Sequence, residues 1–355
     1  MNTASAGVNI AANILGKLET SSSAGMFVRD TGGCLISRLG LSRSKDESKE
    51  ISFAELSESV LFYFSAPAFA RGSTKLFTKQ KNITKDRLLA PMSELCKISD
   101  KTTLKNIKLA KFARTGTVFS VILPAVFGIA PLRNLMSLAS SGKKDFTSLI
   151  GLENKNEQKE KKQAQNKAAK LLKSLGISTI SGLGATFGLL FAAKNKNFYK
   201  KAEPYLDKFL KHLDFTKDYD LKLAHYGALI YPTSIAGYFY ASRDKYERME
   251  NARRFSITVP LMFFGEKLIQ NPIYKKFDKI YKTDVFNGGN IRTYKEISRL
   301  PENMQKQMLK SKNAAYSLTF AINTMAIAAA VALLNRAATR LEFNRDKALV
   351  NNNTK

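Results

Sequence analysis

The chain has 355 residues and a formal net charge of +28, because 57 Lys and Arg residues outnumber 29 Asp and Glu residues. This excess favours an anionic partner, such as phospholipid headgroups or nucleic acid. The two cysteines, Cys34 and Cys96, are too few for a disulfide framework and fit no metal-binding spacing, so we favour two free thiols over one disulfide. With only His212 and His225, a histidine-cluster metal site is excluded within one chain.

The N-terminal region, residues 1–111, is predicted to be helical and to lie on a membrane surface or on the rest of the protein. Apolar residues recur at helical spacing within 8–18, and the charges do not fit a secretory signal. Ser52 and Glu55 have the spacing of a capping box, which predicts a helix over about residues 53–66, ending before a proline.

Four uncharged windows follow, each long enough to cross a hydrocarbon core of about 30 Å as a helix. They are residues 115–132, 174–193, 223–242 and 313–335. A fifth window, 255–273, is interrupted by two charges, so we expect an interfacial or re-entrant helix there. The prediction is an all-α fold, a multi-pass membrane bundle of four to six membrane-associated helices within residues 112–340, with basic amphipathic helices outside the membrane and a polar tail at 341–355.

The first two windows differ in character. Pro124 interrupts the window 115–132, where we expect a kink and not a break. The window 174–193 continues a lysine-rich helix and carries small residues in steps of three and four, which predicts a seam for close helix packing. The seam includes Ser178, Ser181, Ala185 and Gly188.

The later windows carry polar residues at membrane depth. Tyrosines mark the ends of 223–242, an aromatic-belt pattern, and His225 near its start is expected at the interface. The window 313–335 carries a second small-residue seam, which we expect to pack against the helix at 174–193. That seam includes Ala321, Thr324 and Ala328.

Three polar residues are candidates for a transport pathway. Asn323 lies near the middle of its window, Glu266 interrupts the fifth window, and His225 titrates near neutral pH. The simpler interpretations are a hydrogen bond between helices for Asn323, a surface ion pair for Glu266 and an interfacial position for His225.

No catalytic, cofactor or metal motif stands beside these candidates. Asp30-Thr31-Gly32 matches the aspartic-protease tripeptide, but that chemistry needs two such carboxylates in a largely β fold. Glycine-rich windows lack the Gly-Lys-Ser or Gly-Lys-Thr that would cradle phosphate.

We therefore interpret the sequence as a non-enzymatic, multi-pass integral membrane protein with a structural or partner-binding role. Its expected partners are an anionic phospholipid surface and a protein partner or second copy of the chain. A channel or transporter is one alternative. The other is a soluble helical protein that binds an anionic partner such as nucleic acid, which the apolar windows disfavour. Basic residues are spread too evenly between the predicted loops to fix an orientation.

Overall fold

The computed structural model describes residues 27, 31–81, 83–95, 97–153, 161–215, 223–286, 291–322 and 327–353. It is 86% helical, and none of these residues forms a strand, which confirms the all-α prediction. The predicted helix at 8–18 lies outside the described residues. The chain divides into two compact units, and both are built from separated segments. Unit 1 comprises Met1–Glu55, Leu149–Glu153 and Asp244–Lys355, and unit 2 comprises Leu56–Ser148 and Asn154–Arg243.

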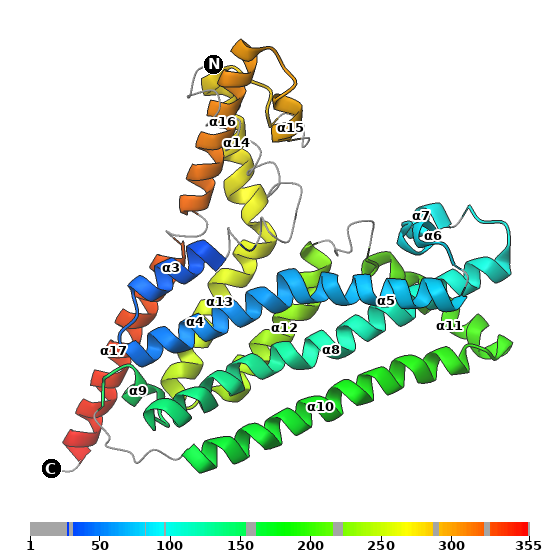
Figure 1. The fold of residues 1–355 in the computed structure, drawn as a ribbon. Coiled ribbons are helices and arrows are strands. Elements are labelled where there is room, and N and C mark those ends of the chain that lie inside the picture. The colour runs from blue at the N-terminus through cyan, green and yellow to red at the C-terminus, as the bar shows by residue number, and fades with distance from the viewer. Residues whose placement is uncertain are drawn as a thin grey trace. The chain divides into compact units, whose positions relative to one another are not determined.

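Unit 2 is organised around one long helix, α8 (Figure 1). The helices α5, α10, α11 and α12 all contact α8. The elements of this unit are the end of α4 (Lys45–Ser59), the π-helical segment η2 (Val60–Ser65), α5 (Ala66–Lys81), α6 (Lys85–Leu89), α7 (Met92–Leu95), α8 (Lys101–Ser141), α9 (Phe146–Leu149), α10 (Lys161–Ala192), α11 (Lys196–His212) and α12 (Leu223–Ala241).

The ends of α8 are fixed by local chemistry. The Asp100 carboxylate accepts hydrogen bonds from the amides of Thr102 and Thr103 at 3.0 and 3.1 Å, which caps the N-terminus. Gly142 follows the last turn in a left-handed conformation with φ of 78°, the usual glycine stop. Between them the helix continues through Pro124 without a break, as predicted.

The predicted domain boundary at 111/112 falls inside α8, because the basic segment 101–114 and the uncharged window 115–132 form one continuous helix. The predicted polar tail at 341–355 is also helical as far as Asn353, since it continues α17 (Ile327–Asn353).

The core of unit 2 consists of two buried clusters at different positions along α8. Where α8 is uncharged, the buried cluster comprises Ala66, Ala70, Leu89, Val118, Phe119, Ile122, Val126, Phe215 and Ile230. Nearer its basic start, the cluster comprises Phe77, Ile83, Leu88, Leu95, Ile107, Ala110 and Ala113. Ala66 and Ala70, near the start of α5, pack with later residues of α8, whereas Phe77, further along α5, packs with earlier residues of α8. The helices α5 and α8 are therefore antiparallel.

The helix predicted at 53–66 begins earlier and runs on further. The amide of Glu47 donates to the Ser44 hydroxyl at 3.0 Å, so Ser44 and not Ser52 caps the start of α4. Ser52 lies inside the helix and donates to the Ser48 carbonyl. At Pro67 the chain passes from η2 into α5 and stays helical.

Two π-helical segments of the described chain, η2 and η3, lie just before a proline. The segment η2 ends two residues before Pro67, and η3 (Glu266–Gln270) ends two residues before Pro272. A proline has no amide proton for the carbonyl four residues earlier, and a wider turn accommodates the missing bond. A proline therefore marks a change of helix type here, whereas the sequence pattern predicted a helix end.

Unit 1 contains a helical hairpin of α14 and α16, which lie side by side in Figure 1. The buried residues beneath this hairpin include Tyr274, Val285, Phe286, Ile297, Met308 and Ala315. Besides the start of α4, the elements of unit 1 are α3 (Gly32–Gly40), α13 (Lys245–Gly265), η3, α14 (Asn271–Tyr281), α15 (Tyr294–Ile297), α16 (Glu302–Phe320) and α17.

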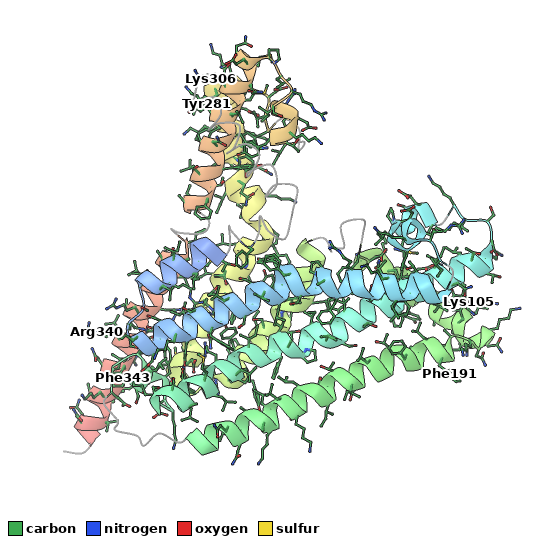
Figure 2. The ribbon with its side chains drawn as sticks, viewed as in Figure 1. Lys105, Phe191, Tyr281, Lys306, Arg340 and Phe343 are labelled. Carbon is green, nitrogen blue, oxygen red and sulfur yellow. The ribbon has the colours of Figure 1, made fainter. Side chains whose placement is uncertain are left out.

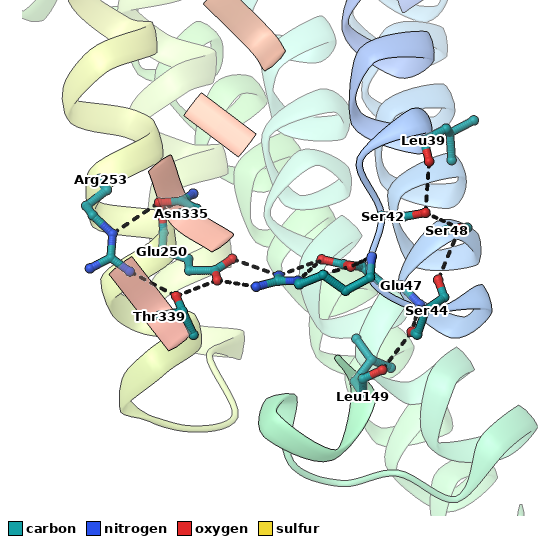
Figure 3. A network of polar contacts seen from close by, with 11 residues as sticks. Leu39, Ser42, Ser44, Glu47, Ser48, Leu149, Glu250, Arg253, Asn335 and Thr339 are labelled. Atoms are coloured by element: carbon teal, nitrogen blue, oxygen red, sulfur yellow. Dashed lines mark hydrogen bonds and ion pairs between the residues drawn. The ribbon is translucent and has the colours of Figure 1, made fainter. Parts of the chain in front are cut away.

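A polar network ties α13 to α17 and to the start of α4 (Figure 3). The Arg43 guanidinium pairs with Glu47 at 2.6 Å and with Glu250 at 2.7 Å, and the Thr339 hydroxyl donates to Glu250 at 2.6 Å. Burial alone would lower the pKa of Arg43, but its two carboxylate partners outweigh burial and raise it. These ion pairs and hydrogen bonds therefore hold α13, α17 and the start of α4 together.

A second arginine extends this network along the same two helices. Arg253 of α13 pairs with Glu342 at 2.7 Å and donates to Asn335 at 3.1 Å, while Asn335 donates to the Glu250 carbonyl at 3.3 Å. Long side chains on α13 are therefore held by partners one turn apart on α17, which favours one register for this helix pair.

Two helices of the described residues are long and apolar enough to cross a membrane, Lys101–Ser141 and Gln165–Ala192. They contain the predicted window 115–132 and all but the last residue of the window 174–193, and a bundle of four to six spans is not confirmed. The window 223–242 is helical as α12, which ends at Ala241. The window 313–335 is divided between α16 and α17, with 323–326 outside the described residues.

Candidate functional site

The helices α8 and α10 form an antiparallel pair that meets at small residues. A Cβ atom added to Gly116 would lie 2.6 Å from Thr186 Cγ2, and one added to Gly182 would lie 2.8 Å from Ser120 Oγ. Further along α8, a Cβ atom on Gly128 would lie 2.5 Å from Leu175 Cδ1. At Gly182 the added atom would also lie 3.4 Å from Ser120 Cα, so glycine there allows the two helices to approach closely.

The predicted seam of α10 requires correction, because a neighbouring face packs on α8. Ser178, Ser181, Ala185 and Gly188 are exposed, and a Cβ atom on Gly188 would meet nothing within 4 Å. The close contacts with α8 come from a neighbouring face of the helix, through Leu175, Gly182 and Thr186. Both sets recur at helical spacing, so spacing alone does not distinguish them.

The opposite face of α10 exposes large apolar side chains. Ile180 is 69% exposed, Phe187 47% and Phe191 72%. Half of the most apolar window of α8 is buried, against 6% of the corresponding window of α10. Figure 2 shows Phe191 at the same end of unit 2 as Lys105, which lies near the start of α8. α10 therefore presents to its surroundings a surface that water solvates poorly.

Helix α11 follows α10 and pairs by charge with the basic start of α8. The Lys108 ammonium lies 3.0 Å from Glu203 and 2.7 Å from Asp207. Lys105 lies 4.4 Å from the centre of the Tyr199 ring, a cation–π contact. The Asn195 side chain caps α11 by accepting from two amides. The segment 101–114 is thus covered by an amphipathic helix.

A buried ionic trio closes this end of unit 2. Lys111 and Arg114 of α8 are both fully buried, and both pair with Asp214, Arg114 at 2.6 Å. Arg114 also donates to the Phe215 carbonyl at 2.7 Å and to the Thr74 hydroxyl at 3.4 Å. With both bases charged, two cations share one carboxylate, so the trio has a net positive charge.

Thr74 also lines a pocket of about 280 Å³. Its lining is formed by Arg71, Thr74, Lys75, Thr78 and Lys85, from α5 and the first residue of α6. Arg71 and Lys75 are one turn apart, as are the two threonines, so α5 presents two cations and two hydroxyls to one space. No carboxylate lines the pocket, although Asp86 is next to Lys85 in the chain.

The pocket lies at a defined level of α8. Arg114, which contacts Thr74, is the last charged residue before the uncharged window 115–132. At the same end, α10 finishes its own uncharged window, and Lys194 follows. The pocket is therefore placed at the border between the apolar and charged parts of the α8–α10 pair.

The structure describes the side chain of none of the three predicted transport residues. Asn323 and Thr324 lie outside the described residues, as does Cys96, and nothing is described of the side chains of Glu266 and His225. Ala321 is exposed and Ala328 is half-buried. Among the described residues, no group of His, Cys, Asp or Glu has a metal-binding arrangement.

Sequence reasoning missed the trio and the pocket. A signal for the trio exists in the chain, because Lys111 and Arg114 are three residues apart at the edge of an uncharged window and so share a helix face. The pocket carries no such signal, since it forms only when α5 and α6 fold beside α8.

The Glu203 carboxylate gives this end of unit 2 a predicted pH dependence. Its hydrogen bond from Lys108 lowers its pKa below the ordinary 4.5, with a further bond from Tyr199. Because the folded pKa is the lower one, the stabilisation is present above pH 4.5 and is lost as the pH falls through the folded pKa. We expect Glu203→Gln to weaken this acid dependence, by less than about 1 kcal/mol because the Glu203 side chain is 40% exposed. Melting curves between pH 3 and 6, roughly the range in which carboxylates titrate, measure it, and unchanged curves would contradict it.

Comparison of the chain with protein-family models, curated proteins and solved structures finds no match.

Proposed function

We propose that this protein is a non-enzymatic, multi-pass integral membrane protein that α8 and α10 hold in the bilayer, and that binds an anionic lipid surface at their basic end. The observation that carries the proposal is the exposed apolar face of α10. Large apolar side chains on that face match a hydrocarbon environment, whereas the small residues facing α8 suit helix packing in lipid.

The charges support the same placement. The uncharged windows of both helices end at one level, and Arg114 and Lys194 follow there. The amphipathic helix α11 begins beside this level and exposes several lysines together with Tyr205. Lysine and tyrosine at the end of an apolar segment are typical of a headgroup boundary. The net charge of +28 favours an anionic leaflet.

The proposal is tested by placing charge on the apolar face of α10. We expect the unmodified protein to stay in the membrane pellet during a carbonate wash at high pH. The double variant Ile180→Lys, Phe187→Lys should be largely released, because each cation costs about 2.5–3.5 kcal/mol at the bilayer centre on insertion scales. The measurement is the pelleted fraction, followed by immunoblot.

The matched control adds two lysines to the same helix outside the uncharged window, as Gln165→Lys, Asn166→Lys, both at exposed positions. It should remain in the pellet. Release of the unmodified protein by carbonate would overturn the proposal. So would a double variant that is more soluble and better folded than the unmodified chain, since that is the behaviour of a soluble helical protein.

A further inference from the structure

We propose that helix α17 lies along the surface of an anionic phospholipid bilayer, with the exposed half of the helix turned to the lipid. The function proposed above concerns unit 2 alone, and this inference extends membrane contact to unit 1; it rests on that function for the presence of the lipid. α17 runs for 27 residues. Helices of this length occur both across a bilayer and along its surface, so the distribution of side chains around α17 decides between the two.

One half of α17 is occupied by contacts within unit 1. Val331, Asn335, Thr339 and Phe343 are buried and follow one another at intervals of four residues, so they share an inner face of the helix. Asn335 and Thr339 form hydrogen bonds with α13 (Figure 3), and the Phe343 ring lies against Tyr246 with 5.8 Å between ring centres. The inner face is therefore committed to α13.

The acidic side chains of α17 are turned towards α13 as well. Glu342 pairs with Arg253 at 2.7 Å. Asp346 accepts a hydrogen bond from the Tyr246 hydroxyl at 2.7 Å and pairs with Lys245 at 2.5 Å. The sequence of α17 contains no other carboxylate. Both negative charges of the helix are therefore used within unit 1.

The outer half of α17 combines an apolar strip with arginine. Leu334 is 47% exposed and Leu341 is 70% exposed. They are seven residues apart, and exposed Ala337 lies between them at helical spacing, so the three side chains form one strip. At about 3.6 residues per turn, exposed Arg340 borders the strip on one side and exposed Arg345 borders it on the other.

Charge decides which partner this outer face fits. Four exposed basic residues flank the strip, namely Arg336, Arg340, Arg345 and Lys347. Two copies of such a face would bring like charges together, which opposes self-association. An anionic bilayer attracts the same charges, and an arginine keeps its guanidinium among the headgroups while its stem covers apolar surface. An apolar face with basic flanks is typical of a helix that lies in the membrane interface.

The experiment measures the depth of α17 in the full chain reconstituted into vesicles. In a Cys34→Ser, Cys96→Ser background, one fluorophore is attached at Ala337→Cys in the strip, or at Asn303→Cys, an exposed reference position on α16. The vesicles contain phosphatidylcholine, either alone or with about a quarter phosphatidylglycerol, which supplies a negative surface potential. Quenching by brominated phosphatidylcholine reports contact with lipid, and quenching by iodide reports contact with water.

The charge variant removes three arginines from the outer face, as Arg336→Gln, Arg340→Gln, Arg345→Gln. Its control removes as many exposed charges from unit 1 outside α17, as Arg299→Gln, Lys306→Gln, Lys310→Gln. With phosphatidylglycerol present, we expect lipid quenching at Ala337→Cys in the otherwise unmodified chain and in the control. In the charge variant, the balance between bound and released α17 should shift towards release by roughly fivefold for each arginine removed, the usual contribution of a basic residue near an anionic surface.

The apolar variant Leu334→Gln, Leu341→Gln tests the strip itself. It should lose lipid quenching in vesicles of either composition, because binding of an interfacial helix scales with the apolar area that it buries. The control changes two exposed apolar side chains elsewhere in unit 1, as Ile280→Gln, Met304→Gln, at positions that are 59% and 45% exposed. This control should be quenched like the unmodified chain.

Two results would overturn the proposal. One is iodide access at Ala337→Cys equal to that at Asn303→Cys, without lipid quenching in the anionic vesicles. The other is protection from iodide that does not depend on lipid charge and disappears when the protein is diluted in the membrane, since that is the behaviour of two copies of α17 in contact.

This test and the carbonate test fail separately. If the protein resists carbonate but Ala337→Cys stays in water, the proposal for unit 2 stands and the assignment of α17 is wrong. If carbonate releases the protein, the same vesicles are added to the released chain. Lipid quenching at Ala337→Cys then identifies a peripheral protein held by α17, and its absence overturns this proposal too.

Discussion

Asp214→Asn should destabilise the folded protein by about 3–5 kcal/mol, the usual cost of removing one partner from a buried ion pair. Asp214 is the shared carboxylate of Lys111 and Arg114, both of which have no exposed side-chain surface. The amide keeps the shape of the carboxylate but leaves two buried cations without a counter-charge. Thermal and denaturant unfolding of the full chain in detergent measure the effect.

Asp207→Asn is the matched control, because its side chain is 43% exposed and pairs with Lys108. Because the Asp207 side chain is solvent-exposed and Lys108 keeps Glu203 as a second partner, this variant should lose about 1 kcal/mol or less. Equal destabilisation by the two changes would show that the trio is not the anchor of this end of unit 2.

The trio and the contacts with α11 also explain how three basic residues of α8, Lys108, Lys111 and Arg114, can be buried. The sequence pattern assigned residues 101–111 to a peripheral helical region, since lysine and arginine are almost never fully buried unless paired. Their partners come from α11 and from Asp214, about a hundred positions away in the chain. Local sequence predicts that a helix forms here, but not which distant carboxylates meet it.

In this chain, the sequence predicts where a helix forms better than it predicts which face of the helix packs. The uncharged windows 115–132 and 174–193 were recognised because absence of charge over such a length is a strong pattern. The face of α10 that packs was missed by one residue, because small residues occur all round this helix. The face of α10 that packs is set by its contacts with Gly116 and Ser120 of α8, which the sequence of α10 alone does not reveal.

The helix start at α4 is a similar case. Serine followed three residues later by glutamate occurs twice, at Ser44 and at Ser52. The apolar periodicity after Ser52 favoured the second copy. The structure uses the first, where Arg43 pairs with Glu47 and the Ser44 hydroxyl donates to the Leu149 carbonyl at 2.7 Å. Contacts with residues distant in the chain thus select between two equivalent local signals.

Gly182→Leu should destabilise the α8–α10 pair strongly. A Cβ atom on Gly182 already lies 2.8 Å from Ser120 Oγ and 3.4 Å from Ser120 Cα, so a leucine forces the helix backbones apart. Overpacking of this kind costs about 1–3 kcal/mol or more, and a seam with Gly116 and Thr186 close by leaves little room for the side chain to turn away. The apparent Tm in detergent, followed by circular dichroism, measures the loss.

Gly188→Leu is the matched substitution on the same helix, and it should be tolerated. Nothing lies within 4 Å of a Cβ atom at Gly188, and leucine has the better helix propensity by about 0.8 kcal/mol or less. The two variants separate the face predicted from spacing from the face that contacts α8. A loss at Gly188 with tolerance at Gly182 would restore the predicted seam, because a leucine can disrupt packing only where a neighbouring backbone is close. A loss at Gly182 alone would establish that α8 and α10 meet through Gly116, Ser120 and Thr186.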